Sequence, residues 1–517
     1  MTTTHTYDVL VVGAGPAGLS TALSATRHGA RVLVVERHPG TSVHPRALGV
    51  TTRSMEVFRT WGLDAAVRAA GLDRSTYQTS LWTLADPAHT PSPAGYPRPH
   101  EARAVSPVEP VLCPQDRLEP LLLDRLRALG ATVAFDTELS TLRTGATGVR
   151  AELTSRVDGA VTTVRSRFVV GADGPRSTVR RTLGITTDHL GSCGTYASVL
   201  FRADLDRLTD GRRYFLYAVE HPDAAGVLLP AGDGRWVYGT RRSADVVDLP
   251  PFTAERWTEL LRTASGVPGL RPDILSVLPF TMEAEVATAF RSGPGFLVGD
   301  AAHRMTPMGG VGMNTAVHDG HNLGWKLAWY LRGPGGEALL DSYDAERRPV
   351  GLRNARSSLR PGAVDAPGGL AGDLGVTYRS AVIADGAAGP VRGFAPSGRP
   401  GERAPHLWVE RSGRRISTLD LFDGGFTLLT GASGARWRHG TPDGTPLTVL
   451  SFGRELSDDG GHAARAHGLT PTGAVLVRPD GHIAWSCAAA PADPAAALDR
   501  ALALALGRSP ATSALAG

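Results

Sequence analysis

The sequence predicts an α/β protein in which a nucleotide-binding fold is interrupted by a separate β-sheet and followed by a small domain. A buried strand, a glycine turn, a helix and a second apolar strand follow one another from Tyr7 to Glu36, as at the start of a βαβ unit. Residues 185–282 carry more aromatic and alternating patterns, which suit a separate sheet. The chain has 517 residues, too many for one hydrophobic core, so two or three domains are expected.

Two later strands return to the first sheet. Ser166–Val170 is a buried apolar run that leads into Gly171 and Asp173, and Phe296–Val298 begins another such strand. Helical periodicity is predicted in three further stretches, residues 51–70, 117–129 and 314–331. The nucleotide-binding domain is therefore expected in two pieces, one on each side of the middle sheet.

A stretch rich in glycine and proline, from Leu370 to Pro405, separates the last segment of the chain. This segment has strand-like runs at Phe426–Leu429 and Ala474–Val477 and an alanine-rich helix at Asp493–Leu506, which predict a small α/β domain. The expected limits are residues 1–182 and 280–390 for the nucleotide-binding domain, 183–279 for the middle domain and 391–517 for the C-terminal domain.

The composition excludes several classes of protein. With 42% hydrophobic and 20% charged residues, the chain is neither disordered nor a membrane protein. The net charge is only +4 and the charges are interspersed, so no nucleic-acid partner is expected. Met1–Tyr7 lacks an export signal and no apolar stretch is long enough to span a membrane, so we expect a cytoplasmic protein. Lys326 is the only lysine, which together with heavy alanine and glycine usage suggests a GC-rich bacterial source.

The cysteine pattern bears on metal and redox chemistry. Cys113, Cys193 and Cys487 lie far apart and form no C-x-x-C pair, which argues against a disulfide framework, a zinc site or a dithiol redox centre. No metal site is predicted. The sequence also lacks the G-x-S-x-G motif of the α/β-hydrolases, so a serine hydrolase is not expected.

Three glycines form a dinucleotide-binding motif. Gly13, Gly15 and Gly18 form G-x-G-x-x-G between a strand and a helix, and Glu36 ends the next strand. The first glycine permits a tight turn, the second admits a pyrophosphate, and the third allows close helix packing. Glu36 would accept hydrogen bonds from ribose hydroxyls, which favours FAD or NAD over NADPH at this site. The alternative is a glycine turn that binds no ligand.

A second dinucleotide fingerprint is absent from the sequence. Gly309, Gly310 and Gly312 in GGVGMN have neither a preceding strand nor the third spacing. One dinucleotide is therefore expected to stay bound, and any other would dock transiently.

Two further segments carry a family resemblance. VGADGPRSTVR (170–180) and FLVGDAAHRMTPMGGVGMN (296–314) resemble signatures of the single-component FAD-dependent aromatic hydroxylases, which share the fold of p-hydroxybenzoate hydroxylase. The chain looks closest to the branch that hydroxylates anthracyclines and other bacterial aromatic polyketides. This resemblance implies a Rossmann-like FAD-binding domain of the GR2 type with an inserted β-sheet domain for the substrate.

The resemblance extends to the C-terminal segment. PSGRPGERAPH (396–406) and VLVRPDGHIAW (475–485) resemble the thioredoxin-like domain of the polyketide branch. Without a C-x-x-C pair such a domain would be redox-inert, and it would serve packing or contacts between copies of the chain in a homo-oligomer.

The resemblance also assigns residues of the second motif to the cofactor. Asp300 matches an aspartate that binds the ribityl chain, and the loop after it lets the backbone approach the flavin. A carboxylate after a buried strand needs polar partners, and glycines leave room for a flat ring. The loop residues implied are Pro307, Gly310, Gly312, Met313 and Asn314. Thr306 and Val311 stand where the family more often has proline and glutamine, which leaves the substrate orientation open. The alternative for Asp300 is a helix N-cap.

Four more positions are implied to lie near the cofactor. Arg46 in HPRALG and Gln115 in CPQDRLEPLL resemble contacts to FAD phosphate or ribityl oxygens, and Leu139 resembles a backbone contact beside the adenine. The alternatives are a surface arginine for Arg46 and a helix cap for Gln115. Asp173, with Gly174 and Arg180, matches a DG motif linked to FAD and NADPH binding. Asp173 could equally cap the helix that follows it.

The implied reaction uses FAD, with NADPH or NADH as a transient co-substrate and oxygen as the oxidant. In this family a flavin hydroperoxide transfers oxygen to an electron-rich aromatic carbon, here of a polyketide-derived polycyclic phenol. The sequence identifies no catalytic base. Tyr214, Phe215 and Tyr217 could line the substrate pocket, although aromatic residues on a strand more often belong to the core. Tyr217 is the preferred candidate, because its neighbourhood resembles the pocket wall of anthracycline hydroxylases.

Other functions on related folds stay open at this point. A Baeyer-Villiger oxygenase acting on a polyketide ketone or quinone shares the scaffold. An FAD halogenase should show W-x-W-x-I-P, which the sequence lacks, and a related reductase or a flavin-binding sensor without enzymatic activity would add no oxygen to a substrate.

Overall fold

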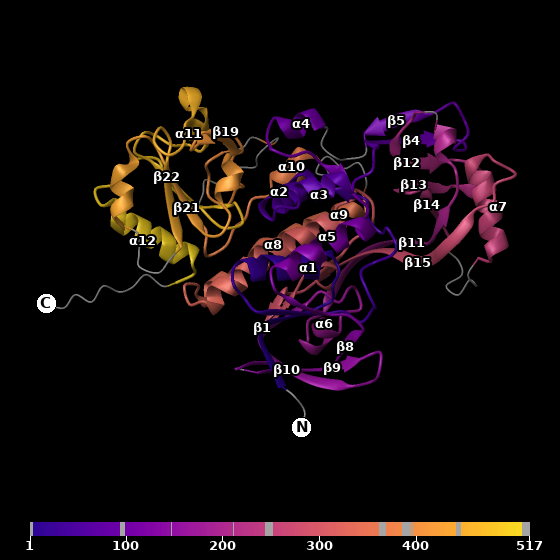
Figure 1. Cartoon of the computed structure of the whole chain (residues 1–517), viewed down its shortest axis with the longest axis horizontal. Coiled ribbons are helices and arrows are strands. Elements are labelled where there is room, and N and C mark those ends of the chain that lie inside the picture. The colour runs from indigo at the N-terminus through magenta and orange to yellow at the C-terminus, as the bar shows by residue number, and fades with distance from the viewer. Residues whose placement is uncertain are drawn as a thin grey trace.

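The computed structural model describes residues 4–93, 99–145, 147–209, 211–242, 252–360, 369–384, 394, 397–440 and 446–508. Figure 1 shows three parts in a row: a C-terminal part in yellow and orange, a central part that contains the longest helices, and a third part built on a second large sheet. The predicted α/β class is therefore confirmed. The predicted domain boundary between residues 390 and 391 lies outside the described residues.

The sheet of the central part is built mainly from parallel strands. In order it contains β16 (Arg291–Ser292), β17 (Gly295–Leu297), β10 (Val161–Gly171), β1 (Thr4–Val12), β2 (Val32–Val35) and β7 (Thr132–Ala134), and β8 (Thr137–Gly145) and β9 (Gly148–Ser155) extend it from β10. β1 pairs in parallel with β10 and β2, and β10 pairs in parallel with β17. The glycine motif, Glu36, Asp173 and Asp300 each follow one of these four strands, so they meet at one edge of the sheet.

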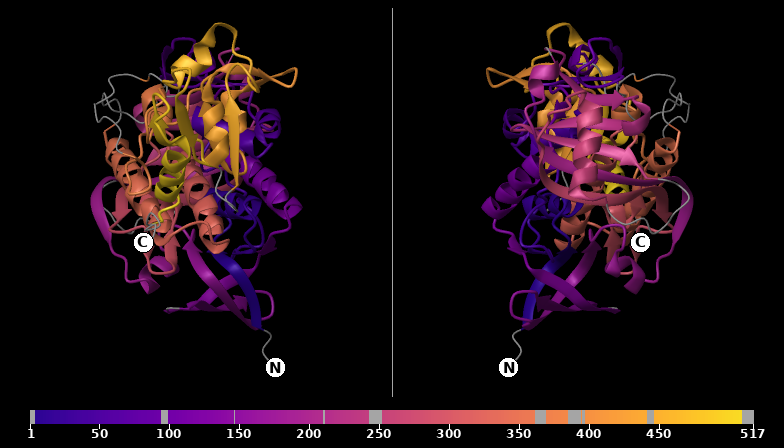
Figure 2. Two further views of the ribbon diagram at one scale, coloured as in Figure 1. Left: turned by 90° about the vertical axis from the view of Figure 1, so that its left-hand side faces the viewer. Right: turned by 90° about the vertical axis from the view of Figure 1, so that its right-hand side faces the viewer.

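Helices cover this sheet and the segments beside it. They are α1 (Pro16–Arg27), α2 (Thr52–Thr60), α3 (Asp64–Ala69), α4 (Pro99–Arg103), α5 (Gln115–Ala128), α6 (Thr178–Thr182), α8 (Gly312–Leu331), α9 (Glu337–Ser358) and α10 (Leu370–Leu374). α8 packs so closely against α1 that a Cβ at Gly320 or Gly324 would lie 2.5 Å from α1 atoms. In both views of Figure 2 strand β1 runs downward beyond the helices toward the N-terminus. Within the described ranges, no helix combines the length and the apolar character that crossing a membrane requires.

The middle part is a large, mostly antiparallel sheet. Its strand order is β18 (His303–Arg304), β15 (Asp273–Ala287), β11 (Thr187–Arg202), β14 (Arg235–Arg241), β13 (Gly226–Gly232), β12 (Tyr214–Val219), β4 (Ser75–Leu81) and β5 (Thr90–Pro93). Helix α7 (Ala254–Ser265) covers one face, where Val199, Tyr238 and Trp257 belong to one buried cluster. The predicted limit at residues 279–280 falls inside β15, which continues unbroken to its pairing with β18.

The C-terminal part contains a four-stranded mixed sheet, in keeping with the thioredoxin-like domain that was predicted. Its order is β22 (Leu447–Ser451), β21 (Phe426–Thr430), β23 (Ala474–Val477) and β24 (Ile483–Cys487), with α11 (His462–Ala466), α12 (Pro494–Ala505) and the hairpin β19 (Trp408–Arg411) and β20 (Arg414–Ser417) beside it. Trp329 of α8 packs against Phe426 with ring centroids 5.2 Å apart. Helix α8 therefore contacts the C-terminal sheet at one end and follows the glycine loop of residues 309–312 at the other.

Candidate functional site

The glycine turn between β1 and α1 leaves open space at one position only. Gly13 has a φ of +110°, and a Cβ there would lie 2.3 Å from the carbonyl oxygen of Ala172. A Cβ at Gly18 would lie 1.9 Å from the carbonyl oxygen of Gly13, whereas a Cβ at Gly15 would meet no atom within 4 Å. Gly15 is also the N-cap of α1, with no side chain capping the helix. The chain itself thus requires the first and third glycines, and the second leaves helix N–H groups accessible to a phosphate.

Glu36 lies beside this turn. Its carboxylate accepts hydrogen bonds from the backbone N–H groups of Ala14, at 2.9 Å, and His38, at 3.0 Å. The backbone N–H of Thr137 donates to the carbonyl oxygen of Glu36 at 2.8 Å, which places the buried Leu139 of β8 next to the same corner. The predicted ribose and adenine positions therefore lie together, and their contacts to FAD stay predictions.

Asp300 is exposed but surrounded by protein. It lies in a 3₁₀ turn, Gly299–Ala301, directly after β17, and among the described residues no group donates a hydrogen bond to its carboxylate. Burial by the surrounding chain raises its pKa, and the charges of His303, Arg304 and Arg46 oppose this. The helix-cap alternative is not realised, because no side chain caps this turn. An exposed carboxylate that accepts no hydrogen bond from the described residues is open to the hydroxyl groups of a ligand.

A buried ionic network holds the Asp300 turn in place. The Asp319 carboxylate accepts hydrogen bonds from the Gly299 N–H at 3.1 Å, His303 Nε2 at 2.6 Å and Arg347 Nε at 2.8 Å. Burial alone would raise the pKa of Asp319, but His303 and Arg347 hold it below its ordinary value. Asp319 is therefore an anion that fixes the backbone immediately before Asp300. The sequence analysis missed it, and the only signal was its position in α8 two turns after the glycine loop.

The DG motif supports the same turn. Asp173 accepts hydrogen bonds from Thr178 N at 2.7 Å and Ser177 Oγ at 2.5 Å, so its carboxylate caps α6. This is the structural alternative for Asp173, and its contact to a cofactor stays a prediction. Arg180 donates to the carbonyl oxygen of Ala301 at 2.8 Å and thereby joins the two motifs.

The loop before α8 is exposed at Pro307 and is held in place by hydrogen bonds of Asn314. Pro307 is exposed, and Gly310 has a φ of +64°, which favours glycine. Gly312 and the half-buried Met313 begin α8, whose first turn has no side-chain cap. The buried Asn314 side chain accepts from Thr51 N and Ser54 Oγ and donates to the carbonyl oxygens of Gly49 and Gly310. These four bonds use its full capacity, so Asn314 anchors the loop to the segment that follows Arg46.

Arg46 and Gln115 approach the site from neighbouring segments. β3 (Gly49–Val50) pairs with β6 (Val111–Leu112), and Gln115 N donates to the carbonyl oxygen of Ala47 at 2.9 Å. Burial raises the pKa of Asp300 and of Glu119, and the charge of the exposed Arg46 side chain opposes this rise at both carboxyls. The Gln115 amide donates to Glu119 at 2.7 Å. Both predicted residues thus lie on the side of the molecule that carries Asp300.

Together these features fit FAD. The site offers an open glycine at a helix N-terminus for the pyrophosphate, a carboxylate beside it for a ribose, a second carboxylate for the ribityl chain and a glycine loop for the flavin.

The middle sheet presents a second candidate surface. Tyr217 is 1% exposed and lies in the cluster on the α7 face, where its hydroxyl donates to the carbonyl oxygen of Arg212. The structure gives no support to its contact with a substrate, which stays a prediction. On the opposite face Tyr196 stacks on Phe280 with ring centroids 5.8 Å apart, and Ser276 bonds His44 at 3.0 Å.

His44 connects this second face to the cofactor side. It lies two residues before Arg46, and burial together with the Arg46 charge lowers its pKa to about 4, so its imidazole is neutral at neutral pH. The sequence analysis missed His44, Tyr196 and Phe280. Alternation along β11 and β15 was the available signal, but it does not tell which face of the sheet lies toward the cofactor.

Known proteins share this architecture. Residues 6–358 match the family described as FAD binding domain, and residues 397–509 match the family described as aromatic-ring hydroxylase, C-terminal. Tetracenomycin B2 monooxygenase-dioxygenase of Streptomyces olivaceus is 39% identical, over 97% of this chain and 98% of that protein. Aklavinone 12-hydroxylase of Streptomyces peucetius is also 39% identical, over 87% of this chain and 96% of that protein.

A solved structure extends the comparison to three dimensions. The crystal structure of a ternary complex of aklavinone-11 hydroxylase with FAD and aklavinone superposes with a TM-score of 0.89 at 34% identity, and it covers 98% of this chain and 99% of its own. The two family matches, the relatives and the superposition all indicate the same family. The chain belongs to the FAD-dependent aromatic-ring hydroxylases.

Proposed function

We propose that the chain is a monooxygenase that takes two electrons from NADPH and adds one oxygen atom of O₂ to the aromatic ring of a polycyclic phenol. The second oxygen atom leaves as water. The observation that carries the proposal is the Asp300 carboxylate, which is exposed next to the start of α1 and has no hydrogen-bond donor among the described residues. Relatives named for tetracenomycin and aklavinone support a substrate derived from an aromatic polyketide.

The residues of this chain divide the work of binding and positioning. FAD, when bound, supplies the redox chemistry that activates oxygen. The N-terminus of α1 at Gly15 would hold the pyrophosphate, Glu36 a ribose and Asp300 the ribityl chain. The N-terminus of α8, at Gly312, places a partial positive charge behind the glycine loop, which suits an electron-rich group.

The substrate would lie against the face of the middle sheet opposite α7. Tyr196 and Phe280 offer a stacked aromatic pair to a planar ring system, and apolar side chains of this face exclude water. The neutral His44 imidazole can share a hydrogen bond with a phenol without adding charge.

The activity test uses the purified, FAD-loaded protein with oxygen, NADPH or NADH, and a panel of polycyclic phenols. The expected result is substrate-stimulated oxidation of the nicotinamide and a product heavier by one oxygen atom. Because a Baeyer-Villiger reaction adds the same mass, the product is identified by NMR. A new ring hydroxyl supports the proposal, whereas a ring-expanded ester, or nicotinamide oxidation that no substrate stimulates, contradicts it.

The binding site is tested separately. Glu36→Ala and Asp300→Ala should each weaken FAD binding, measured by the quenching of flavin fluorescence as apoprotein is titrated. FAD affinity unchanged in both variants would show that the cofactor lies elsewhere.

A further inference from the structure

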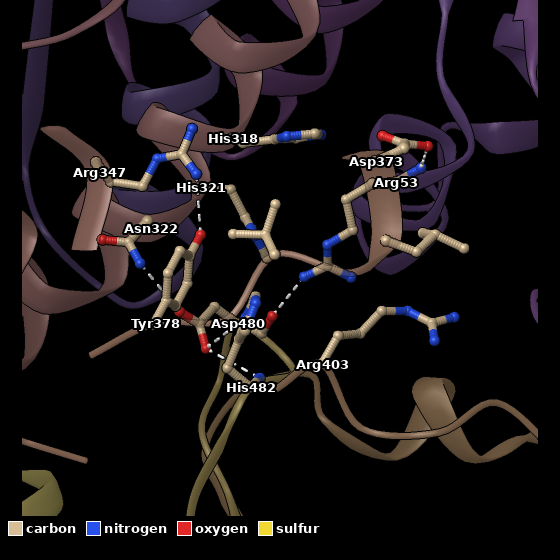
Figure 3. A pocket seen from close by; sticks show the side chains of 12 residues that line it. Arg53, His318, His321, Asn322, Arg347, Asp373, Tyr378, Arg403, Asp480 and His482 are labelled. Carbon is tan, nitrogen blue, oxygen red and sulfur yellow. Dashed lines mark hydrogen bonds and ion pairs between the residues drawn. The ribbon is translucent and has the colours of Figure 1, made fainter. Parts of the chain in front are cut away.

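A series of buried side chains in contact with one another connects the C-terminal domain to the central domain. The His482 ring stacks on the Tyr378 ring, with centroids 4.2 Å apart and an angle of 28° between the planes. Arg347 Nη1 donates to the Tyr378 hydroxyl at 3.1 Å, and Arg347 Nε donates to Asp319 at 2.8 Å. Figure 3 shows His482, Tyr378 and Arg347 around one small pocket.

These contacts end at the turn that contains Asp300. Asp319 accepts the hydrogen bond of the Gly299 N–H, and Gly299 directly precedes Asp300. Arg347 Nη2 also donates to the carbonyl oxygen of Thr315, in the first turn of α8. One guanidinium group, on α9, therefore contacts the linker to the C-terminal domain, the start of α8 and the carboxylate that holds the Asp300 turn.

The side chains that link His482 to Asp319 are buried. The Arg347 and Asp319 side chains are 1% and 0% exposed, and Tyr378 is 5% exposed. In such surroundings hydrogen bonds to charged groups are strong, and a lost partner is not replaced by bulk water. Moving Tyr378 therefore changes the position of Arg347 more than it would at a surface.

The pocket itself is not a ligand site for a metabolite. It offers about 20 Å³, which is room for water only. The arginines that line it are already paired with carboxylates: Arg53 and Arg403 with Glu56, and Arg347 with Asp319. Its importance lies in the contacts between the domains that surround it.

We propose that Tyr378 and His482 are positioning residues for the FAD site. Through them the C-terminal domain holds Arg347, and through Arg347 and Asp319 it holds the turn that presents Asp300. This gives the thioredoxin-like domain, which has no C-x-x-C pair, a role in cofactor binding. The inference rests on the proposed role of Asp300, so the experiment also includes an Asp300 variant.

The first test uses Tyr378→Phe, which removes the hydroxyl that accepts from Arg347 but keeps the ring stacked on His482. The matched control is Ser380→Ala. Ser380 lies on the same linker, and its hydroxyl donates to Glu346 at 2.8 Å. Glu346 is buried and pairs with Arg478, so the contact of Ser380 does not lie between Tyr378 and Asp319. We expect Tyr378→Phe to raise the FAD Kd between about twofold and thirtyfold. Ser380→Ala should leave the FAD Kd unchanged, even if both variants lower the melting temperature.

The second test asks whether the path enters the C-terminal domain. His482→Ala removes the stacked ring and should raise the FAD Kd by a smaller factor. In the double variant with Tyr378→Phe, the combined factor should fall short of the product of the two single factors, because both changes release the same Arg347. If the factors by which the two variants change the FAD Kd simply multiply in the double variant, His482 does not act through Tyr378, and the C-terminal domain does not position Arg347.

The outcomes separate the site assignment from the positioning role. Asp300→Ala with unchanged FAD affinity would overturn the role of Asp300 in FAD binding, on which the inference rests. Asp300→Ala with weakened affinity, together with Tyr378→Phe and Ser380→Ala that change the Kd equally or not at all, would overturn only the positioning role. Weakened affinity in Asp300→Ala and Tyr378→Phe, but not in Ser380→Ala, supports both.

Discussion

Arg180 donates a hydrogen bond of 2.8 Å to the carbonyl oxygen of Ala301, 121 residues further along the chain. Its other terminal nitrogen donates to the carbonyl oxygen of Pro175, in the turn after β10. One side chain thus fixes the relative position of two turns that follow neighbouring parallel strands, β10 and β17. The turn of one motif, with Asp300, depends on the helix of the other.

Replacing Arg180 should therefore weaken FAD binding, because the turn that presents Asp300 loses a hydrogen bond that holds it. Arg180→Met keeps much of the side-chain length but leaves the Ala301 carbonyl without its donor, and we expect FAD affinity to fall by about tenfold, which corresponds to about 1.4 kcal/mol. Arg181→Met is the control, since within the described ranges the Arg181 side chain donates to Arg176 O and Thr178 Oγ1, which lie in or just before its own helix. Equal affinities in the two variants, measured by FAD titration, would contradict the link between the motifs.

Substitutions in the glycine turn should separate an effect on FAD affinity from an effect on protein stability. Gly15→Ala adds a methyl group in open space, so it should cost less than about 1 kcal/mol of stability. The same methyl group would obstruct a pyrophosphate, and FAD affinity should fall at least about tenfold. Gly13→Ala combines a positive φ with a contact of 2.3 Å to a backbone oxygen, so it should destabilise the apoprotein by about 1–3 kcal/mol. Thermal unfolding of both apoproteins and FAD titration check the contrast; a Gly15→Ala protein that binds FAD normally would argue against this site.

The sequence predicted the strands and turns at the edge of the central sheet that carries the motifs, because each of these elements is formed by residues close together in the sequence. A strand, a turn and a helix in succession define the environment of Gly13–Gly18, and Asp300 follows its strand directly. The role of Asn314 could not be predicted, because its partners Thr51 and Gly49 lie more than 250 residues away. Tyr217 could not be placed either. Which face of β12 it occupies depends on the pairing of β12 with β13 and β4, and β4 comes from a distant part of the chain.

The buried Asp373 should make stability depend on pH. Burial raises its pKa to about 6, above the ordinary 3.8, so the folded state favours the protonated carboxyl. Its contribution to stability is complete below about pH 4 and is lost as the pH rises through 6. Asp373→Asn keeps an oxygen that can accept from the Arg53 N–H, which now donates to Asp373 at 3.0 Å. The variant should match the wild type near pH 4 and exceed it at pH 8 by up to about 3 kcal/mol. Urea unfolding across this range measures the difference, and a difference independent of pH would refute the assignment.

The junction between the central and C-terminal domains contains a fully buried ion cluster. Arg478 donates to both oxygens of Glu346, at 2.6 and 2.9 Å, and pairs with Asp480, while Lys326 donates to Glu346 at 2.7 Å. The side chains of Arg478, Glu346 and Lys326 are 0% exposed. Removing one cation leaves carboxylates in a site that water does not reach, which costs more than the loss of a surface pair.

Arg478→Met should therefore destabilise the protein by about 3–5 kcal/mol. The control is Arg27→Met, which breaks the ion pair of Arg27 with the exposed Asp423 and should lower the free energy of unfolding by no more than about 1 kcal/mol. Lys326 supplies an independent readout, because the only lysine of the chain is buried in the same cluster and can react with an amine reagent only when the junction opens. Mass spectrometry should find Lys326 unlabelled in the native wild type and in Arg27→Met, and labelled much faster in Arg478→Met. If Lys326 were labelled at equal rates in all three proteins, the cluster would not be what keeps the two domains together.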